Sequence, residues 1–81
     1  MKARYEEGTI SAEAAIARQD VASKMKDMRL SMNLTQQDLA DRSGTQKSNI
    51  SRMESGKYNP SLDFLVKVAD SMGKHVLVKF E

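Results

Sequence analysis

The chain has 81 residues, of which 40% are hydrophobic and 30% charged, and it contains four glycines and one proline. This composition is typical of one small soluble globular domain, and the length excludes a second hydrophobic core. Because the sequence has no cysteine and only one histidine, it excludes disulfides, thiolate zinc sites and histidine-rich metal sites. It also lacks a membrane-spanning apolar run and a signal-peptide pattern, so we expect a cytoplasmic protein.

The net charge of +2 is too small to identify a partner, but the charge is unevenly distributed along the chain. Residues 1–23 carry a net charge of −1, whereas residues 42–59 carry a net charge of +3. We therefore expect an anionic partner at the centre of the chain and a different kind of partner at its N-terminal end.

Apolar residues recur at spacings of three and four in the first part of the chain, which is the period of one stripe on an amphipathic helix. The members of this stripe are Ile10, Ala14, Ala17, Val21, Met25, Met28 and Met32. The pattern predicts a long first helix from Ser11 to Met32, with Ser11 as its N-cap. We expect the second half of this helix to pack on the core and its first half to project toward a partner.

Start and stop signals predict a short second helix. Thr35 and Asp38 fit the [ST]-x-x-[DE] capping pattern, in which the threonine side chain accepts a hydrogen bond from the helix entry. The helix is expected over residues 36–43. It should end at Gly44, because glycine adopts a positive φ at little cost.

The same signals predict two more helices. Thr45 is expected to cap a third helix over residues 46–55 that ends at Gly56. The Pro60–Ser61 pair should start a fourth helix that ends at Gly73. The side chains expected to form the common core are Leu34, Leu39, Ile50, Met53, Leu62 and Leu65.

The last residues change to the alternating period of a strand, since Val76, Val78 and Phe80 alternate with Leu77 and Lys79. A single strand leaves its backbone donors and acceptors unpaired, so we expect two copies to pair antiparallel in a two-fold dimer. The alternative is a frayed C-terminal tail. The expected fold is therefore all-α, a compact helical bundle with one short C-terminal β-strand.

Several spaced positions in the central segment form one motif. They are Thr35-Gln36, Leu39-Ala40, Gly44, Ile50-Ser51, Glu54-x-Gly56 and Pro60-Ser61-Leu62. The motif closely resembles the helix-turn-helix domain of phage repressors and Cro, and of the wider XRE-like family of transcriptional regulators. The resemblance covers residues 21–73 and implies a DNA-binding domain.

The third helix should present a short, polar and basic face. Its outward residues are Gln46, Lys47, Ser48, Asn49 and Arg52. Gln and Asn can bond to adenine edges, and Lys and Arg can bond to guanine edges, when a helix enters the major groove. We expect these five side chains to read bases, with a merely solvated helix face as the alternative.

Further residues are expected to hold the DNA backbone or the fold. The resemblance implies that Gln36, at the start of the second helix, clamps a phosphate and that Lys57 and Asn59 add contacts from the loop after the third helix. The alternatives are ordinary helix-entry chemistry for Gln36 and a solvated turn charge for Lys57. The resemblance also implies a partly buried, structural ion pair between Arg29 and Glu54.

Two segments lie outside the motif: an N-terminal extension over residues 1–20, acidic on balance, and the closing strand over residues 74–81. This layout resembles that of HigA-like antitoxins of type II toxin–antitoxin pairs. In that group a helix-turn-helix dimer represses its own operon and neutralises a RelE-like ribonuclease toxin. The resemblance implies that Tyr5, Ile10 and Ile16 contact a toxin, and an acidic extension suits a basic partner.

Two other functions stay open. The chain can be a stand-alone or phage-type regulator without a toxin, which co-purification would distinguish. It can also be a protein-interaction scaffold, which the salt dependence of DNA binding would distinguish. An enzyme is not expected, because the sequence has no Ser-His-Asp set, metal cluster or phosphate-cradling glycine loop; no cofactor or metal is expected either.

Overall fold

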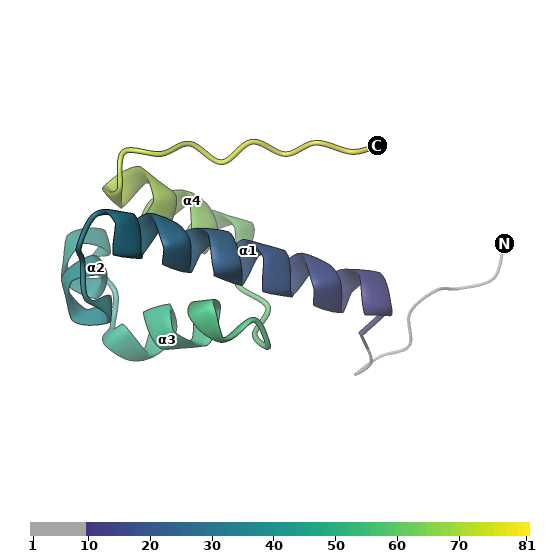
Figure 1. Ribbon diagram of the computed structural model, residues 1–81, viewed down its shortest axis with the longest axis horizontal. Coiled ribbons are helices and arrows are strands. Elements are labelled where there is room, and N and C mark those ends of the chain that lie inside the picture. Colours follow the sequence, from purple (N-terminus) through teal and green to yellow (C-terminus); the bar gives the residue numbers. More distant parts are fainter. Residues whose placement is uncertain (1–9) are drawn as a thin grey trace, which may run out of the picture.

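The computed structural model describes residues 10–81, and within this range it has four helices and no strand. The helices are α1 (Ala12–Ser31), α2 (Gln36–Ser43), α3 (Lys47–Ser55) and α4 (Leu62–Ser71). In Figure 1, α1 runs along the molecule between α3 on one side and α4 on the other, and α2 closes one end. None of these helices is long and apolar enough to cross a membrane. The all-helical prediction is therefore confirmed.

Helix α1 has the bounds that its apolar stripe predicts. The Ser11 hydroxyl accepts a hydrogen bond from the Ala14 N–H at 3.1 Å, and Met32 is the C-cap. Ala22 and Met25 are buried in the second half of the helix. Figure 1 shows the N-terminal end of α1 extending beyond α3 and α4. The second half therefore packs on the core while the first half is largely exposed, as predicted.

A reciprocal capping box begins α2. The Asp38 N–H donates to Thr35 Oγ1 at 3.0 Å, and the Thr35 N–H donates to Asp38 Oδ2 at 2.9 Å. The helix ends at Gly44, whose φ of 69° is in the left-handed region that glycine adopts without strain. The predicted bounds of this helix are confirmed.

The predicted cap of α3 is wrong. Gln46 is the N-cap and makes no side-chain capping bond, whereas Thr45 Oγ1 accepts a hydrogen bond from Asn49 Nδ2 at 2.9 Å. The Thr45 N–H still donates to the Ala40 carbonyl at 2.9 Å. Thr45 therefore belongs to the turn that ends α2, and α3 begins one residue later than a Thr45 cap requires.

All four helices contribute side chains to the core. The buried members are Met25, Leu39, Ala40, Ile50, Met53, Val68, Ala69 and Met72. Leu34, Phe64 and Leu65 pack against them from the edge. Leu62 is 57% exposed, so its predicted place in the core is wrong. Leu62 is the first residue of α4 and lies at the edge of its apolar face. At this end of the helix, Phe64 packs against the core.

Residues 74–81 form an extended segment without regular secondary structure. In Figure 1 this segment runs back over α4 and α1. Val76 packs against the core, whereas Leu77 and Phe80 are 92% and 91% exposed. A strand exists only where another strand pairs with its backbone, and the described chain offers none. The described chain therefore has no strand here, and the strand predicted to pair with a second copy stays a prediction.

Candidate nucleic-acid interface

Helix α3 is oriented by two apolar side chains. Ile50 and Met53 are 0% and 2% exposed, and they fix that face of the helix against the core. The opposite face is exposed, and it carries Lys47, Ser48 and Arg52 together with Gln46 at the N-cap. Four of the five side chains predicted to read bases therefore lie together on one accessible surface.

Ser51 also lies on this exposed face and was not among the predicted residues. It follows Ser48 by three residues and Lys47 by four, the spacings that place side chains on the same side of a helix. That periodicity is visible in the sequence and is the signal that would have included Ser51.

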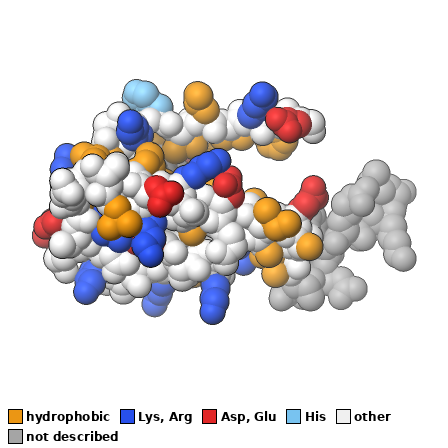
Figure 2. All heavy atoms as spheres, in the orientation of Figure 1, with side chains coloured by type: hydrophobic (Ala, Val, Ile, Leu, Met, Phe, Trp, Pro, Cys, Tyr) orange, Lys and Arg blue, Asp and Glu red, His pale blue; other side chains and the backbone are white. Residues whose placement is uncertain are grey.

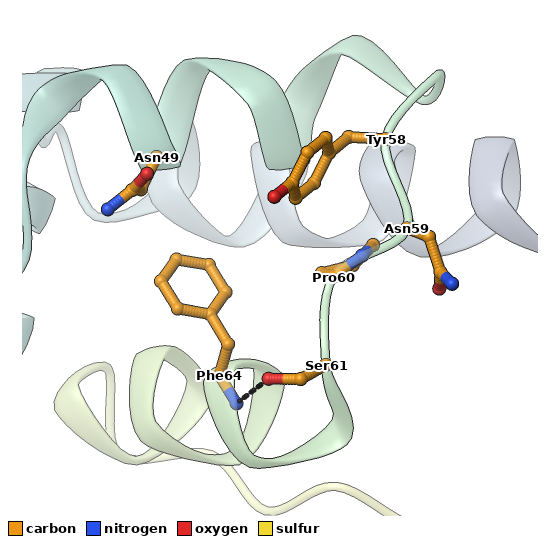
Figure 3. A pocket seen from close by; sticks show the side chains of 6 residues that line it. All are labelled: Asn49, Tyr58, Asn59, Pro60, Ser61 and Phe64. Atoms are coloured by element: carbon orange, nitrogen blue, oxygen red, sulfur yellow. Dashed lines mark hydrogen bonds between the residues drawn. The ribbon is translucent and has the colours of Figure 1, made fainter.

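Asn49 differs from the other predicted base-reading residues because it is half-buried between α3 and α4. Its Nδ2 atom donates to Thr45 Oγ1 at 2.9 Å. With Tyr58 and Phe64 it lines a surface pocket of about 290 Å³. Figure 3 shows the Asn49 amide directed away from the Tyr58 ring and the side chain of Asn59 pointing away from the pocket. Asn49 therefore lies at the flank of the exposed face, where its amide is held by a neighbouring side chain.

Arg52 and Tyr58 form the C-terminal end of the candidate interface. The guanidinium carbon of Arg52 lies 5.8 Å from the centroid of the Tyr58 ring, within the range of a cation–π contact. Tyr58 is 50% exposed, so about half of its surface stays open to solvent beside Arg52. This contact places Arg52 beside the loop that carries Lys57 and Asn59, both of which are exposed.

The first residue of α2 is Gln36, which is half-buried. In the described chain, the backbone N–H groups of the first two residues of α2, which precede Asp38, have no hydrogen-bond acceptor. Such groups, at the positive end of the helix dipole, are suited to a phosphate oxygen. The side chain of Gln36 is already engaged, because its Nε2 atom donates to Glu54 Oε1 at 3.1 Å.

Arg29 and Glu54 form a bidentate ion pair beneath this surface. Arg29 Nε lies 2.7 Å from Glu54 Oε2, and Arg29 Nη2 lies 3.0 Å from Glu54 Oε1. Their side chains are only 8% and 3% exposed, so the pair is more deeply buried than the sequence indicates. The hydrogen bond to Glu54 raises the pKa of Arg29, with burial opposing and the charge of Glu54 reinforcing the shift.

Because Glu54 points inward, the exposed charged side chains of residues 42–59 are all basic. Residues 42–59 contain four basic residues and one acidic residue, and that acidic residue is Glu54. The basic residues Arg42, Lys47, Arg52 and Lys57 are all exposed. Figure 2 shows basic side chains projecting along the lower edge of the molecule, where α3 lies in Figure 1, without acidic side chains on that edge. This surface is suited to a polyanion.

The predicted toxin-contact residues are only partly placed. Tyr5 lies outside the described residues. Ile10 and Ile16 are 41% and 69% exposed at the N-terminal end of α1, so both are accessible.

A family model described as a helix-turn-helix, HTH_3, matches residues 25–78. The chain belongs to this family. An uncharacterised HTH-type transcriptional regulator of Archaeoglobus fulgidus is 43% identical over 47 residues, covering 58% of this chain and 66% of that protein, slightly under two thirds. A similar regulator of Methanocaldococcus jannaschii is 43% identical over 51 residues, covering 63% of this chain and 77% of that protein.

Two solved structures share the fold. An HTH_3 family transcriptional regulator from Vibrio cholerae superposes with a TM-score of 0.72 at 23% identity, covering 75% of this chain but 34% of that one. A toxin–antitoxin module from Streptococcus pneumoniae has a TM-score of 0.67 at 32% identity, covering 90% of this chain and 84% of that one. The chain is therefore a member of the HTH_3 helix-turn-helix family, and the relatives named above are HTH-type transcriptional regulators.

Proposed function

We propose that this protein is a sequence-specific transcriptional repressor that inserts α3 into the major groove of an operator. The residues proposed to read bases are Gln46, Lys47, Ser48, Asn49 and Arg52, and those proposed to hold phosphates are Gln36, Lys57 and Asn59. The observation that supports this most strongly is the exposed basic face of α3, a helix whose own carboxylate, Glu54, is turned inward. A helix of this kind fits the major groove, and phosphate contacts fix its register.

One recognition helix covers few base pairs, so we propose that a homodimer binds an inverted repeat. Residues 74–81 support this role, because Val76 is anchored on the core while Leu77 and Phe80 are exposed. Two such segments pairing antiparallel would satisfy the backbone groups of both copies. In this arrangement the half-sites lie about 34–36 Å apart, one turn of the duplex.

We further propose that the repressor is the antitoxin of a type II pair, which neutralises a RelE-like ribonuclease and represses its own operon. Two observations support this. The likeness to the Streptococcus pneumoniae toxin–antitoxin module covers 90% of the chain and so extends beyond the helix-turn-helix. Ile10, just before α1, and Ile16, in its first half, are 41% and 69% exposed and so are accessible to a partner.

DNA binding is tested with Lys47→Ala and Lys57→Ala on one operator and on single-base variants of it. Lys47→Ala should relax the preference at one base position by about 1–3 kcal/mol. Lys57→Ala should weaken binding to all sequences alike and reduce the salt slope by about one phosphate contact. Lys24→Ala is the control, because Lys24 lies on the side of α1 that faces residues 74–77, and this segment lies across the molecule from α3 (Figure 1). Binding that ignores salt would rule out this interface.

The antitoxin role is tested by co-purification from the native locus. The wild-type chain should carry a small basic ribonuclease, and Ile16→Asp should release it. Leu30→Asp is the matched control, because Leu30 is also exposed on α1 but at its other end. Recovery of the homodimer alone would favour a stand-alone regulator.

A further inference from the structure

The buried ion pair holds a third side chain besides its own two members. Glu54 Oε1 accepts hydrogen bonds both from Arg29 Nη2 at 3.0 Å and from Gln36 Nε2 at 3.1 Å. The carboxylate at the end of α3 is therefore shared between the end of α1 and the start of α2.

Arg29 also fixes the backbone that leads into α2. Its Nη1 atom donates to the Leu34 carbonyl at 2.7 Å, one residue before the Thr35 N-cap. Arg29 is 7% exposed, so water does not compete freely for these bonds. One guanidinium thus links α1, the turn before α2 and, through Glu54, the side chain of Gln36.

We infer that Arg29 and Glu54 are positioning residues for the DNA-backbone contact of Gln36. The Gln36 Nε2 atom carries two hydrogens. Glu54 accepts one of them, which fixes the plane of the carboxamide and leaves the other for a phosphate oxygen. The inference rests on the proposed DNA binding, and it gives the ion pair a role beyond holding α1 against α3.

The physical advantage is preorganisation. A glutamine side chain that is free in solution loses rotamer freedom when it binds a phosphate, whereas one already held by Glu54 has lost that freedom during folding. Immobilising one such side chain on binding costs roughly three- to tenfold in affinity. Glu54 therefore strengthens DNA binding without touching the DNA.

A double-mutant cycle on the full chain tests this inference. Kd for one duplex is measured by fluorescence anisotropy for wild type, Gln36→Ala, Glu54→Gln and the double variant. Glu54→Gln keeps the size of the side chain but replaces one acceptor oxygen by an NH2 group, so Arg29 and Gln36 can no longer both be satisfied. Gln37→Ala is the control, because Gln37 is exposed and donates to Asp41 at 2.9 Å, apart from this network.

Gln36→Ala should weaken binding roughly tenfold in the wild-type background and less than about twofold in the Glu54→Gln background. An equal loss in both backgrounds would show that Glu54 is only structural and would overturn the inference. No loss in either background would overturn it too, while leaving DNA binding by the wild type intact. A wild-type chain that binds no duplex would instead overturn the proposed function and this inference together.

A second measurement needs no change at Glu54, in case that variant fails to fold. Side-chain NH2 relaxation in the folded wild-type protein, without DNA, should show the Gln36 carboxamide to be nearly as ordered as the backbone. The Gln46 carboxamide, which is exposed and makes no capping hydrogen bond, should be clearly more mobile. Equal mobility of the two side chains would overturn the inference.

Discussion

The helical body of the molecule (residues 21–73) has an apolar core, whereas the segments at its two ends (residues 10–20 and 74–81) leave large apolar side chains exposed. In the body, Leu39, Ile50 and Val68 are fully buried. At the ends, Ile16, Leu77 and Phe80 are 69%, 92% and 91% exposed. Exposed apolar surface of this kind is common at sites where another molecule binds. The body is therefore held by its own contacts, whereas the ends leave apolar side chains uncovered, as the proposed partner contacts require.

Ion pairs divide along the same line. The Arg29–Glu54 pair in the body is buried and bidentate. The Lys79–Glu81 pair at the C-terminal end has side chains that are 83% and 85% exposed, and the Asp20–Lys24 pair near the middle of α1 has side chains that are 59% and 72% exposed. Exposed pairs contribute about 0–1 kcal/mol to stability, whereas removing one partner from a buried pair costs several times more. The two kinds of pair therefore provide a direct test of the comparison.

Removal of Glu54 should have the largest effect. Glu54→Ala should lower the free energy of unfolding by about 3–5 kcal/mol, because Arg29 keeps a buried charge without its partner. Urea denaturation at fixed protein concentration measures this loss. Asp20→Ala is the matched control at the exposed pair and should change stability by less than about 0.5 kcal/mol. Similar losses for the two variants would contradict the division between body and ends.

Replacing one buried and one exposed isoleucine by alanine tests whether apolar residues of the body and of the ends contribute differently to stability. Ile50→Ala should cost about 2–5 kcal/mol, because it opens a cavity in a fully buried part of the core. Ile16→Ala should cost less than about 0.5 kcal/mol, because most of this side chain is already in water. Thermal and urea unfolding of the two variants would show the difference. A large loss at Ile16 would mean that the first half of α1 belongs to the body.

Local signals account for what the sequence predicted well. The starts of α1, α2 and α4 follow from side chains that cap their own helix, namely Ser11, Thr35 and Ser61. The ends of α2 and α4 follow from Gly44 and Gly73 at positive φ. Such interactions span three or four residues and depend little on the rest of the fold. The exposed face of α3 could likewise be read from its helical period, although Ser51 was overlooked.

What the sequence could not reveal depends on tertiary or intermolecular contacts. The bond from Gln36 to Glu54 joins residues 18 positions apart on different helices. Asn49 was expected on the open face, but the packing of α3 against α4 places it at the pocket beside Phe64. Strand periodicity over residues 74–81 reports an alternating side-chain pattern, but a strand also needs a partner backbone, which this pattern does not supply.

Removing the capping box of α2 should change stability less than the substitutions above, and the change should depend on pH. Hydrogen bonds from the Thr35 backbone and side chain lower the pKa of Asp38 below its ordinary value of 3.8. The folded state therefore binds fewer protons at this group, so its stabilising contribution is present above pH 3.8 and is lost as the pH falls through the lowered value. Asp38→Asn should flatten this part of the stability-against-pH curve. Chemical denaturation between neutral and acidic pH measures it, and an unchanged curve would mean that the capping bond is not maintained in solution.

Deletion of residues 77–81 should have the smallest effect on folding and the clearest effect on assembly. Val76, the one apolar side chain of the segment that packs against the core, is kept, and the residues removed are exposed. The free energy of unfolding of the monomer should therefore change by less than about 0.5 kcal/mol. Sedimentation equilibrium should show that the truncated chain is monomeric under conditions in which the full chain is a dimer. A truncated chain that still forms the dimer would show that the C-terminal segment does not hold the copies together. A stability loss above about 1 kcal/mol would place the segment with the body, because only residues packed on the core can contribute that much.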